Sequence, residues 1–299
     1  MRFRSILNFA VAAALAALFL PLSVAAADAE HPTLQQLIEA GASVMWVAPH
    51  PDDEALSGPV LALAGPTLGN RVYMLVLTRG DGGECLLPEG CEPSLGAVRH
   101  EEMKRVAELY HAQLDHREYW NAPLPAKSFP PRDEIARIWT DQGIGDPIEV
   151  IAEAIRDFRP DVLLTFSPDR GFTGHPEHQL SSRLAMQAVV AADDPQRELG
   201  GLAPYHVPNC YYMLNRYWPM RMVGKADPGP YTETFDIKQP CAEGMSCVKM
   251  MSEFTRQHRT QAKDMGSVRR FAWLLGGKAY LRRVDPFTQA PDPFEPPAD

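Results

Sequence analysis

The chain has 299 residues and a formal net charge of −9, with 29 lysines and arginines against 38 aspartates and glutamates. This acidic excess argues against nucleic acid or anionic lipid as a partner, because polyanions bind basic surfaces. The length is sufficient for one α/β domain with a substantial core.

The first 27 residues have the three parts of a secretory signal peptide. Arg2 and Arg4 form a basic start, Ile6 to Leu20 is mostly apolar, and Ala25 to Ala27 offers small residues for cleavage. We therefore expect a periplasmic or secreted protein with no stable membrane span after processing. An uncleaved membrane anchor is the alternative, although its apolar run is shorter than the roughly 20 residues that a span needs.

Apolar patterns predict strands that alternate with helices along the chain. The expected strands are 44–48, 71–78, 118–120, 161–166 and 209–214, and the expected helices are 55–63, 95–110, 148–158, 176–190 and 253–265. Such alternation favours an α/β fold in which a largely parallel sheet has helices on both faces. We expect one domain over residues 28–284 and a proline-rich, disordered tail over 285–299.

All five cysteines follow the expected leader. Cys85 and Cys91 flank a short segment that contains glycine, as do Cys241 and Cys247, so two local disulfides are expected in an oxidising compartment. Cys210 would then be unpaired in an apolar strand. Five free thiols remain the alternative, because the sequence does not define the pairing. A cysteine zinc cluster is disfavoured because the pairs lack CxxC spacing.

Histidines and acidic residues follow two of the expected strands. The first loop has the sequence HPDDE at residues 50–54, and the second contains HPEH at residues 175–178. The carboxyl ends of parallel strands meet at one edge of a sheet. The two loops should therefore lie close together if they flank the point where the strand order reverses.

The residue types in these loops indicate a metal site. Zinc takes imidazole nitrogen and carboxylate oxygen, and a catalytic zinc site uses three protein ligands beside a water position. His50 and Asp53 would provide two ligands, and either His175 or His178 the third. Asp52 is then suited to be the general base, because a metal lowers the pKa of bound water to about 7. A protonated histidine could supply the proton that a leaving amine requires.

Helix capping is the simpler interpretation of each loop. Asp52 and Asp53 stand where helix N-caps occur, Glu54 suits a first helical turn, and Pro176 suits a helix start. Capping accounts for one acidic residue but not for a histidine followed by three acidic residues. The two loops taken together therefore favour a functional site.

These motifs resemble those of the LmbE-like (PIG-L) de-N-acetylases. APHPDDEALSG at residues 48–58 is similar to the AHPDDE signature of that family, and GHPEH at 174–178 is similar to its second histidine motif. TRGDGGE at 78–84, Arg99 with Glu102, and HRTQ at 258–261 continue the resemblance in the family's order. It covers most of residues 28–284 and implies a Rossmann-like fold and a zinc-dependent hydrolase. Such enzymes remove acyl groups, usually acetyl, from amino sugars.

By motif position, the resemblance implies a role for each ionisable residue of the loops. His50, Asp53 and His178 match ligands of one zinc ion, and Asp52 matches the general base. His175 matches a histidine that stabilises the transition state or donates a proton.

Further positions match the family less closely. Glu177 takes the place of an acidic residue, often aspartate, that tunes His175, and Arg99 matches an arginine that helps to hold substrate. Thr173 stands where some members have a tyrosine, and Asn121 stands near a position where an aspartate contacts substrate. These departures affect the expected substrate preference and leave the expected metal chemistry unchanged.

The sequence therefore predicts an exported zinc hydrolase that releases the N-acyl group of a GlcNAc-type amino-sugar conjugate. An amidase acting on a non-sugar amide is the nearest alternative. A metal- or sugar-binding protein without turnover is the other, and it has no need of both Asp52 and His175. The glycines of residues 80–83 do not complete GxGxxG, which disfavours nucleotide binding. His258 and Arg259 are expected to be packing or surface groups.

Overall fold

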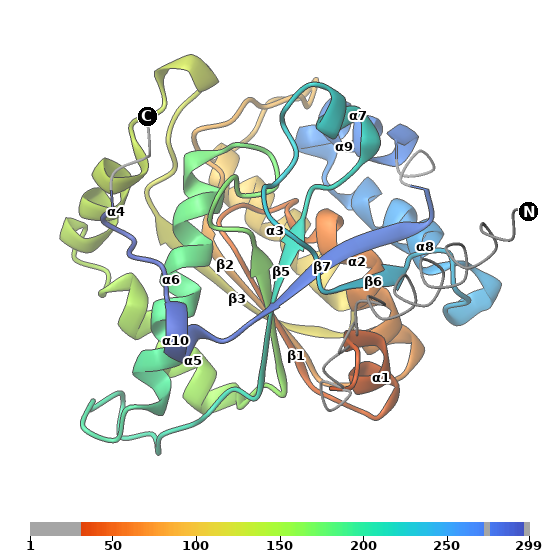
Figure 1. Ribbon diagram of the computed structural model, residues 1–299. Helices are drawn as coiled ribbons and strands as arrows, with labels where there is room; N and C mark the ends of the chain where they lie inside the picture. Colours follow the sequence, from red (N-terminus) through yellow and green to blue (C-terminus); the bar gives the residue numbers. More distant parts are fainter. Residues whose placement is uncertain (1–30, 272–275, 296–299) are drawn as a thin grey trace, which may run out of the picture. The chain divides into compact units, whose positions relative to one another are not determined.

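Five consecutive apolar residues, Val44–Ala48, form the central strand β1, and all five are fully buried. In the computed structural model, which describes residues 31–271 and 276–295, the sheet has the strand order β3-β2-β1-β4-β5-β7-β6 (Figure 1). The other strands are β2 (Val72–Thr78), β3 (Ala112–Tyr119), β4 (Val162–Phe166), β5 (Asn209–Leu214), β6 (Glu233–Asp236) and β7 (Lys278–Val284). The expected leader, residues 1–27, lies outside the described residues.

The sheet confirms the predicted α/β class, since β1 to β5 all pair in parallel. The sequence analysis missed β6 and β7, which add to the edge at β5 in antiparallel pairs. In β7, buried Ala279 and Leu281 alternate with more exposed residues, so the strand has no continuous apolar run. β3 is longer than the expected 118–120 for a similar reason, because it is a polar strand at the sheet edge.

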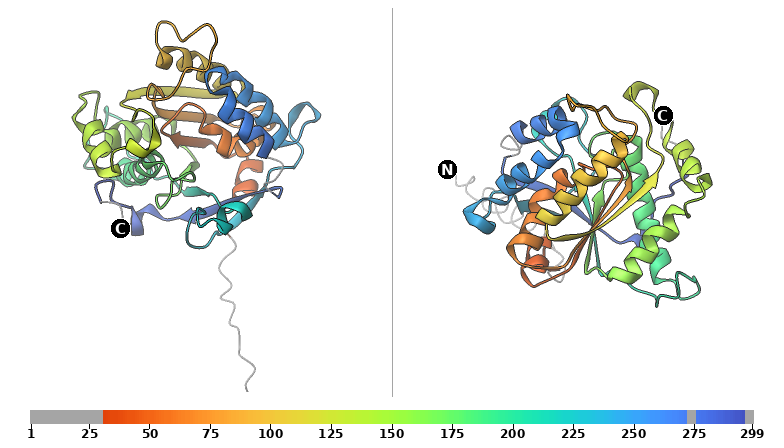
Figure 2. Two further views of the ribbon diagram at one scale, coloured as in Figure 1. Left: turned by 90° about the horizontal axis from the view of Figure 1, so that it is seen from above. Right: turned by 180° about the vertical axis from the view of Figure 1, so that it is seen from behind.

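Helices cover both faces of the sheet, because alternate residues of β1 point into two separate cores. One core contains side chains of α1 (Leu34–Glu39), α2 (Glu54–Ala62), α3 (Leu95–Leu109) and α8 (Cys247–Phe254). The other contains side chains of α4 (Arg132–Asp141), α5 (Pro147–Phe158) and α6 (Pro176–Asp193). Figure 2 shows the two helical layers from above and from behind. Among the described residues, no helix combines the length and apolar character needed to cross a membrane.

Three helical regions differ from the expectation. α4 was not expected, because it begins directly after a proline-rich stretch. α2 continues into a π-helical turn, Leu63–Thr67. The helix expected over 253–265 is instead the end of α8 and the start of α9 (Ala262–Phe271), separated by two short 3-10 turns over 255–261. That break places residues 258–261 against the turn that follows β1.

Residues 285–295 of the tail, which was expected to be disordered, pack on α6. They begin with α10 (Pro286–Gln289), whose start is capped by the Asp285 carboxylate. Arg183 of α6 donates hydrogen bonds to the carbonyl of Asp292 at 2.8 Å and to the carboxylate of Glu295 at 3.0 Å. A buried guanidinium needs such acceptors, and the tail provides them.

The cysteines are paired as expected. Disulfides join Cys85 to Cys91 and Cys241 to Cys247, and Cys210 in β5 is a buried free thiol.

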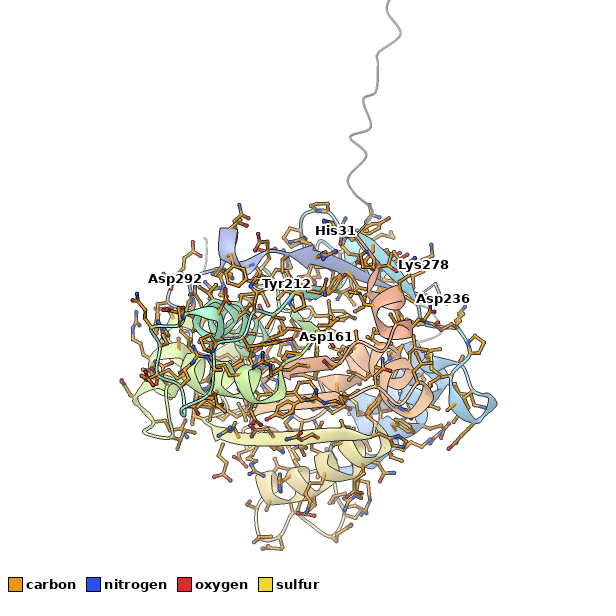
Figure 3. The ribbon with its side chains drawn as sticks, turned by 90° about the horizontal axis from the view of Figure 1, so that it is seen from below. His31, Asp161, Tyr212, Asp236, Lys278 and Asp292 are labelled. Carbon is orange, nitrogen blue, oxygen red and sulfur yellow. A yellow bond between two sulfur atoms is a disulfide. The ribbon has the colours of Figure 1, made fainter. Side chains whose placement is uncertain are left out.

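The order of strands reverses between β1 and β4, which pair with each other. At their amino ends, Ser43 donates from its backbone and its hydroxyl to Asp161 at 2.8 and 2.7 Å, and Figure 3 labels Asp161. At their carboxyl ends, the two strands lead into the two motif loops. The loops are therefore neighbours at a topological switch point, where ligands bind in open α/β sheets.

Candidate active site

The turn after β1 folds its acidic side chains back toward His50. Asp53 accepts a hydrogen bond from the backbone N–H of His50 at 2.9 Å, and it makes no side-chain capping bond to α2. Asp52 has a φ of 120°, which L residues rarely adopt and which is typically retained at functional sites. Capping therefore does not account for the two aspartates.

The second loop brings two histidines to the start of α6. His175 is the N-cap, and its Nδ1 accepts a hydrogen bond from the backbone N–H of Glu177 at 3.2 Å. His178 lies in the first turn and is buried. Gly171 packs so closely on it that an added Cβ would lie 2.4 Å from the Cβ of His178. The loop thus fits closely around His178.

Three side chains with metal-ligating atoms converge between the two loops. Nδ1 of His50 lies 3.1 Å from Nε2 of His178. The Asp53 oxygens lie 3.1 Å from Nε2 of His178 and 3.3 Å from Nδ1 of His50. Ligands in a tetrahedral zinc site, with bonds of about 2.0–2.1 Å, are separated by about 3.3 Å. Asp53 uses Oδ1 toward His178 and Oδ2 toward His50, and each of the three separations is close to the ligand spacing of such a site.

The outer nitrogens of both histidines are already hydrogen-bonded. Nε2 of His50 contacts the carboxylate of Glu177, and Nδ1 of His178 lies 2.8 Å from the carbonyl oxygen of Gly171. When both rings are neutral, each donates a hydrogen bond from its outer nitrogen to one of these acceptors, and the two inner nitrogens then present lone pairs to each other. A cation between them removes that repulsion, and outer partners of this kind are typical of metal-binding histidines. The residues present therefore fit a metal ion.

Electrostatic shifts in the cluster favour the same conclusion. Burial lowers the pKa of His50, but the nearby carboxylates of Asp53 and Glu177 outweigh burial and raise it to about 10. Burial raises the pKa of Asp53, but His178 and His50 outweigh that effect and hold it well below its ordinary value. Both shifts indicate that the cluster favours a positive charge.

His175 belongs to the site, although its place differs from that of the three ligands. Ligand atoms of His50, His175 and His178 lie within 4.8 Å of one another, so a three-histidine set is also a geometric option. Asp53 is the better third ligand, because its oxygens lie closer to the other two ligand atoms and Nδ1 of His175 is already an acceptor. Burial lowers the pKa of His175 to about 2. Neutral His175 thus carries its proton on Nε2 and can donate a hydrogen bond.

Glu177 supports His50, which corrects the expectation that it tunes His175. Its carboxylate contacts Nε2 of His50 and accepts hydrogen bonds from Asn121 Nδ2 at 2.8 Å and the Ala122 N–H at 2.7 Å. Only its backbone N–H reaches His175. Asn121, which stands where a substrate contact was considered, is committed to Glu177 and to the Gly82 N–H.

Gln261 is a site residue that the sequence analysis did not identify. Its side-chain amide donates a hydrogen bond to Oδ2 of Asp52. His258, expected to be a packing or surface group, is buried and bonds at 2.9 Å to Glu54, which accepts the Asp52 N–H at 3.1 Å. The segment 258–261 therefore holds Asp52 through both its carboxylate and its backbone. The HRTQ resemblance was the signal that could have pointed to this contact.

The environment of Asp52 suits a general base. Burial, with a smaller effect of neighbouring Asp53, raises the pKa of Asp52 to about 7. A carboxylate with a raised pKa accepts a proton more readily near neutral pH, as a general base must.

Arg99, for which the resemblance implies a role in holding substrate, is one of the residues that line the cleft. The side chain is buried beside the cleft, and its guanidinium donates to the carbonyls of Gly80 at 2.7 Å and Glu84 at 3.3 Å. An added Cβ at Gly83 would lie 2.6 Å from both terminal nitrogens. The glycine-rich loop is therefore shaped to hold this guanidinium.

These groups line one cleft of about 510 Å³, a size typical of small-molecule sites. The sequence-predicted residues His50, Asp52, Asp53, Arg99, His175 and His178 all line it, and Glu177 lies behind His50. The arrangement combines side chains that could hold a metal ion, a carboxylate suited to act as a base, and a hydrogen-bond donor. Together these groups can hydrolyse an amide.

Comparisons with known proteins agree with this site. The family model described as PIG-L, GlcNAc-PI de-N-acetylase, matches residues 45–189, which include both motif loops. A 1D-myo-inositol 2-acetamido-2-deoxy-alpha-D-glucopyranoside deacetylase of Kineococcus radiotolerans is 29% identical over 198 residues, covering 60% of this chain and 53% of that protein. The matched region thus spans about half the length of that relative.

Two solved structures share the fold. N,N'-diacetylchitobiose deacetylase from Pyrococcus horikoshii has a TM-score of 0.59 at 17% identity, covering 85% of this chain and 88% of that chain. GalB, the 4-carboxy-2-hydroxymuconate hydratase from Pseudomonas putida KT2440, also has a TM-score of 0.59 at 17% identity, covering 82% and 96%. Because these two proteins are named for different reactions, the fold alone does not define the chemistry.

Proposed function

This chain belongs, through residues 45–189, to the PIG-L (LmbE-like) family, and from that premise we propose that it is a zinc-dependent N-deacetylase of GlcNAc-type amino-sugar conjugates. The observation that carries the proposal is the convergence of His50, Asp53 and His178 in a cleft that Asp52 and His175 also line. A protein that only binds sugar or metal has no use for a positioned base. The substrate of the Kineococcus relative supports an amino-sugar amide over other amides.

The three ligands would hold zinc at the base of the cleft. When bound, the ion would polarise the amide carbonyl and lower the pKa of a water molecule to about 7. Asp52 then takes the proton of the attacking water, with Gln261 fixing one carboxylate oxygen and leaving the other available. His175 donates a hydrogen bond from Nε2 to the carbonyl oxygen as negative charge develops there. Asp52 returns that proton to the amine nitrogen as the C–N bond breaks, and the other proton of the attacking water passes to the freed amine, so that an ammonium group and a carboxylate are released.

Metal removal is the direct test. Protein stripped with a chelator should release no amine from GlcNAc glycosides and should recover activity when zinc is restored, while circular dichroism shows that the fold persists. Full activity without metal would contradict the zinc mechanism. A zinc-loaded protein that releases no amine from a panel of N-acetylated sugars would indicate binding without turnover. Release only from non-sugar amides would indicate the amidase alternative.

We also propose that the protein is exported, as its first 27 residues suggest. The two disulfides support this proposal, because such bonds persist in oxidising compartments. Cell fractionation should recover the processed protein outside the cytoplasm, and a full-length cytoplasmic protein would contradict export.

A further inference from the structure

Three large apolar side chains line the catalytic cleft without belonging to a core. They are Leu86, Leu124 and Phe129. Leu86 is 39% exposed and Leu124 is 46% exposed. Within residues 31–271 and 276–295, none of the three is a member of a hydrophobic cluster or packs against one. Folding therefore does not explain why these positions are apolar.

The backbone beside each of these side chains is fixed. The Leu86 N–H donates to the carbonyl of Thr260 at 3.3 Å, and the neighbouring Cys85 is disulfide-bonded to Cys91. The Leu124 N–H donates to the carbonyl of Gly82 at 2.9 Å. Both leucines are thus held at the cleft by contacts with segments that also line it. A ligand that covers these leucines therefore does not have to order the backbone that carries them.

Burial separates the cleft into a polar floor and a partly apolar mouth. Asp53 and His178 are each 5% exposed, whereas the two leucines are both exposed. The amide of a substrate has to reach the floor, where the ligand cluster lies. An acetyl group is too short to leave the floor, whereas an aglycone on the neighbouring C1 of the sugar can be long enough to reach Leu86 and Leu124.

The charged residues at the mouth do not select a charged aglycone. Glu84, Lys263 and Asp264 also line the cleft and are exposed, and their charges are of mixed sign. Exposed leucines gain free energy when apolar groups cover them, by about 0.8 kcal/mol per buried methylene. The mouth thus favours an apolar group over a polar or uniformly charged one.

We propose that the amino-sugar substrate carries an apolar aglycone, an alkyl or aryl group, that packs against Leu86 and Leu124 at the mouth of the cleft. This inference rests on the proposed deacetylase function. Phe129, whose ring centroid lies 4.4 Å from that of His175, continues the apolar surface toward the catalytic groups.

The test compares hexyl and methyl glycosides of GlcNAc with the zinc-loaded protein, below the concentration at which the hexyl compound aggregates. We expect kcat/KM for amine release to be about tenfold higher for the hexyl glycoside, the effect of burying about two methylenes. Leu86→Ser with Leu124→Ser should bring the ratio close to one. Leu68→Ser is the matched control, because Leu68 is 44% exposed but does not line the cleft, and it should keep the wild-type ratio.

Several outcomes would overturn the proposal. A hexyl-to-methyl ratio near one in the wild-type protein would do so, as would a ratio that the double variant leaves unchanged. A methyl glycoside with an N-octanoyl group that is preferred through the same two leucines would assign them to the acyl chain instead. Calorimetric binding of both glycosides separates this inference from the proposed function. Tighter hexyl binding that the double variant abolishes, without amine release, would support the apolar mouth and contradict deacetylation.

Discussion

Two pairs of histidines in this molecule have ring nitrogens at the same separation, yet their surroundings differ. Nδ1 of His50 lies 3.1 Å from Nε2 of His178 in the candidate active site. Nδ1 of His100 lies 3.1 Å from Nδ1 of His116, between α3 and β3. Distance alone would make both pairs candidates for metal binding.

The partners of the outer nitrogens distinguish the pairs. Nε2 of His116 donates to the carbonyl of Thr78 at 2.8 Å, so its Nδ1 is an acceptor that His100 can supply with a proton. That pair is an ordinary hydrogen bond. In the active-site pair, both outer nitrogens have acceptors, Glu177 and the Gly171 carbonyl, so two neutral rings would face each other with lone pairs beside Asp53.

The charged groups around the two histidine pairs also differ. Carboxylates raise the pKa of His50, whereas burial, with Arg79 nearby, lowers the pKa of His116 to about 3. The candidate metal site therefore differs from the second pair in the carboxylates around its histidines.

Two single variants, each lacking one histidine of one pair, should show the largest difference in zinc content and amine release. His178→Ala should reduce zinc from about one ion per chain to near zero and reduce amine release to the background rate, because three protein ligands become two. His116→Gln should keep both zinc and activity. Elemental analysis and an amine-release assay measure the two effects. A zinc-loaded His178→Ala, or zinc loss in His116→Gln, would remove the distinction between the pairs.

Replacing Asp52 should cause the next largest loss of activity. Asp52→Asn should retain zinc, since Asp52 is not one of the three converging ligands, but lower kcat by about 10²- to 10⁴-fold, as expected for loss of a general base. Steady-state kinetics with metal analysis would measure both. An Asn variant with wild-type kcat would assign the base to another group.

The sequence was sufficient for the parts of the site that follow buried apolar strands. β1 and β4 are continuous apolar runs, so their ends, and hence the two motif loops, could be placed at one sheet edge. His50, Asp53, His175 and His178 were therefore expected to lie together, and the structure brings them together.

The sequence was insufficient where partners come from distant, irregular segments. Gln261 lies in a 3-10 turn within a region expected to be one helix, and nothing in its local pattern indicates a partner 209 residues earlier in the chain. Glu177 was expected to tune its neighbour His175, but its side chain extends from the start of α6 to His50, where the carboxylate contacts Nε2. Side-chain direction at a helix start depends on packing, which periodicity does not define.

Gln261 should have a smaller effect than Asp52, because it acts through the Asp52 carboxylate. Gln261→Ala should lower kcat by about tenfold, the equivalent of one hydrogen bond to a charged group, with zinc content and KM unchanged. Gln257→Ala, a half-buried glutamine in the adjoining 3-10 turn, is the matched control and should keep wild-type kcat. Combining Gln261→Ala with Asp52→Asn should add little further loss. Fully additive losses would show that Gln261 acts independently of Asp52.

The second histidine pair should appear in the pH dependence of stability. The pKa of His116 is about 3 in the folded protein and about 6.5 when unfolded, so the unfolded chain takes up a proton first as pH falls. Stability is therefore unaffected above pH 6.5 and declines between 6.5 and 3, by about 2 kcal/mol at pH 5. His116→Gln lacks this titration, and its urea midpoint should fall less than that of the wild type between pH 7 and pH 5. All other titrating groups are common to both proteins. An equal fall in the urea midpoint would therefore mean that folding does not lower the pKa of His116, and the electrostatic contrast between the two pairs would lose its support.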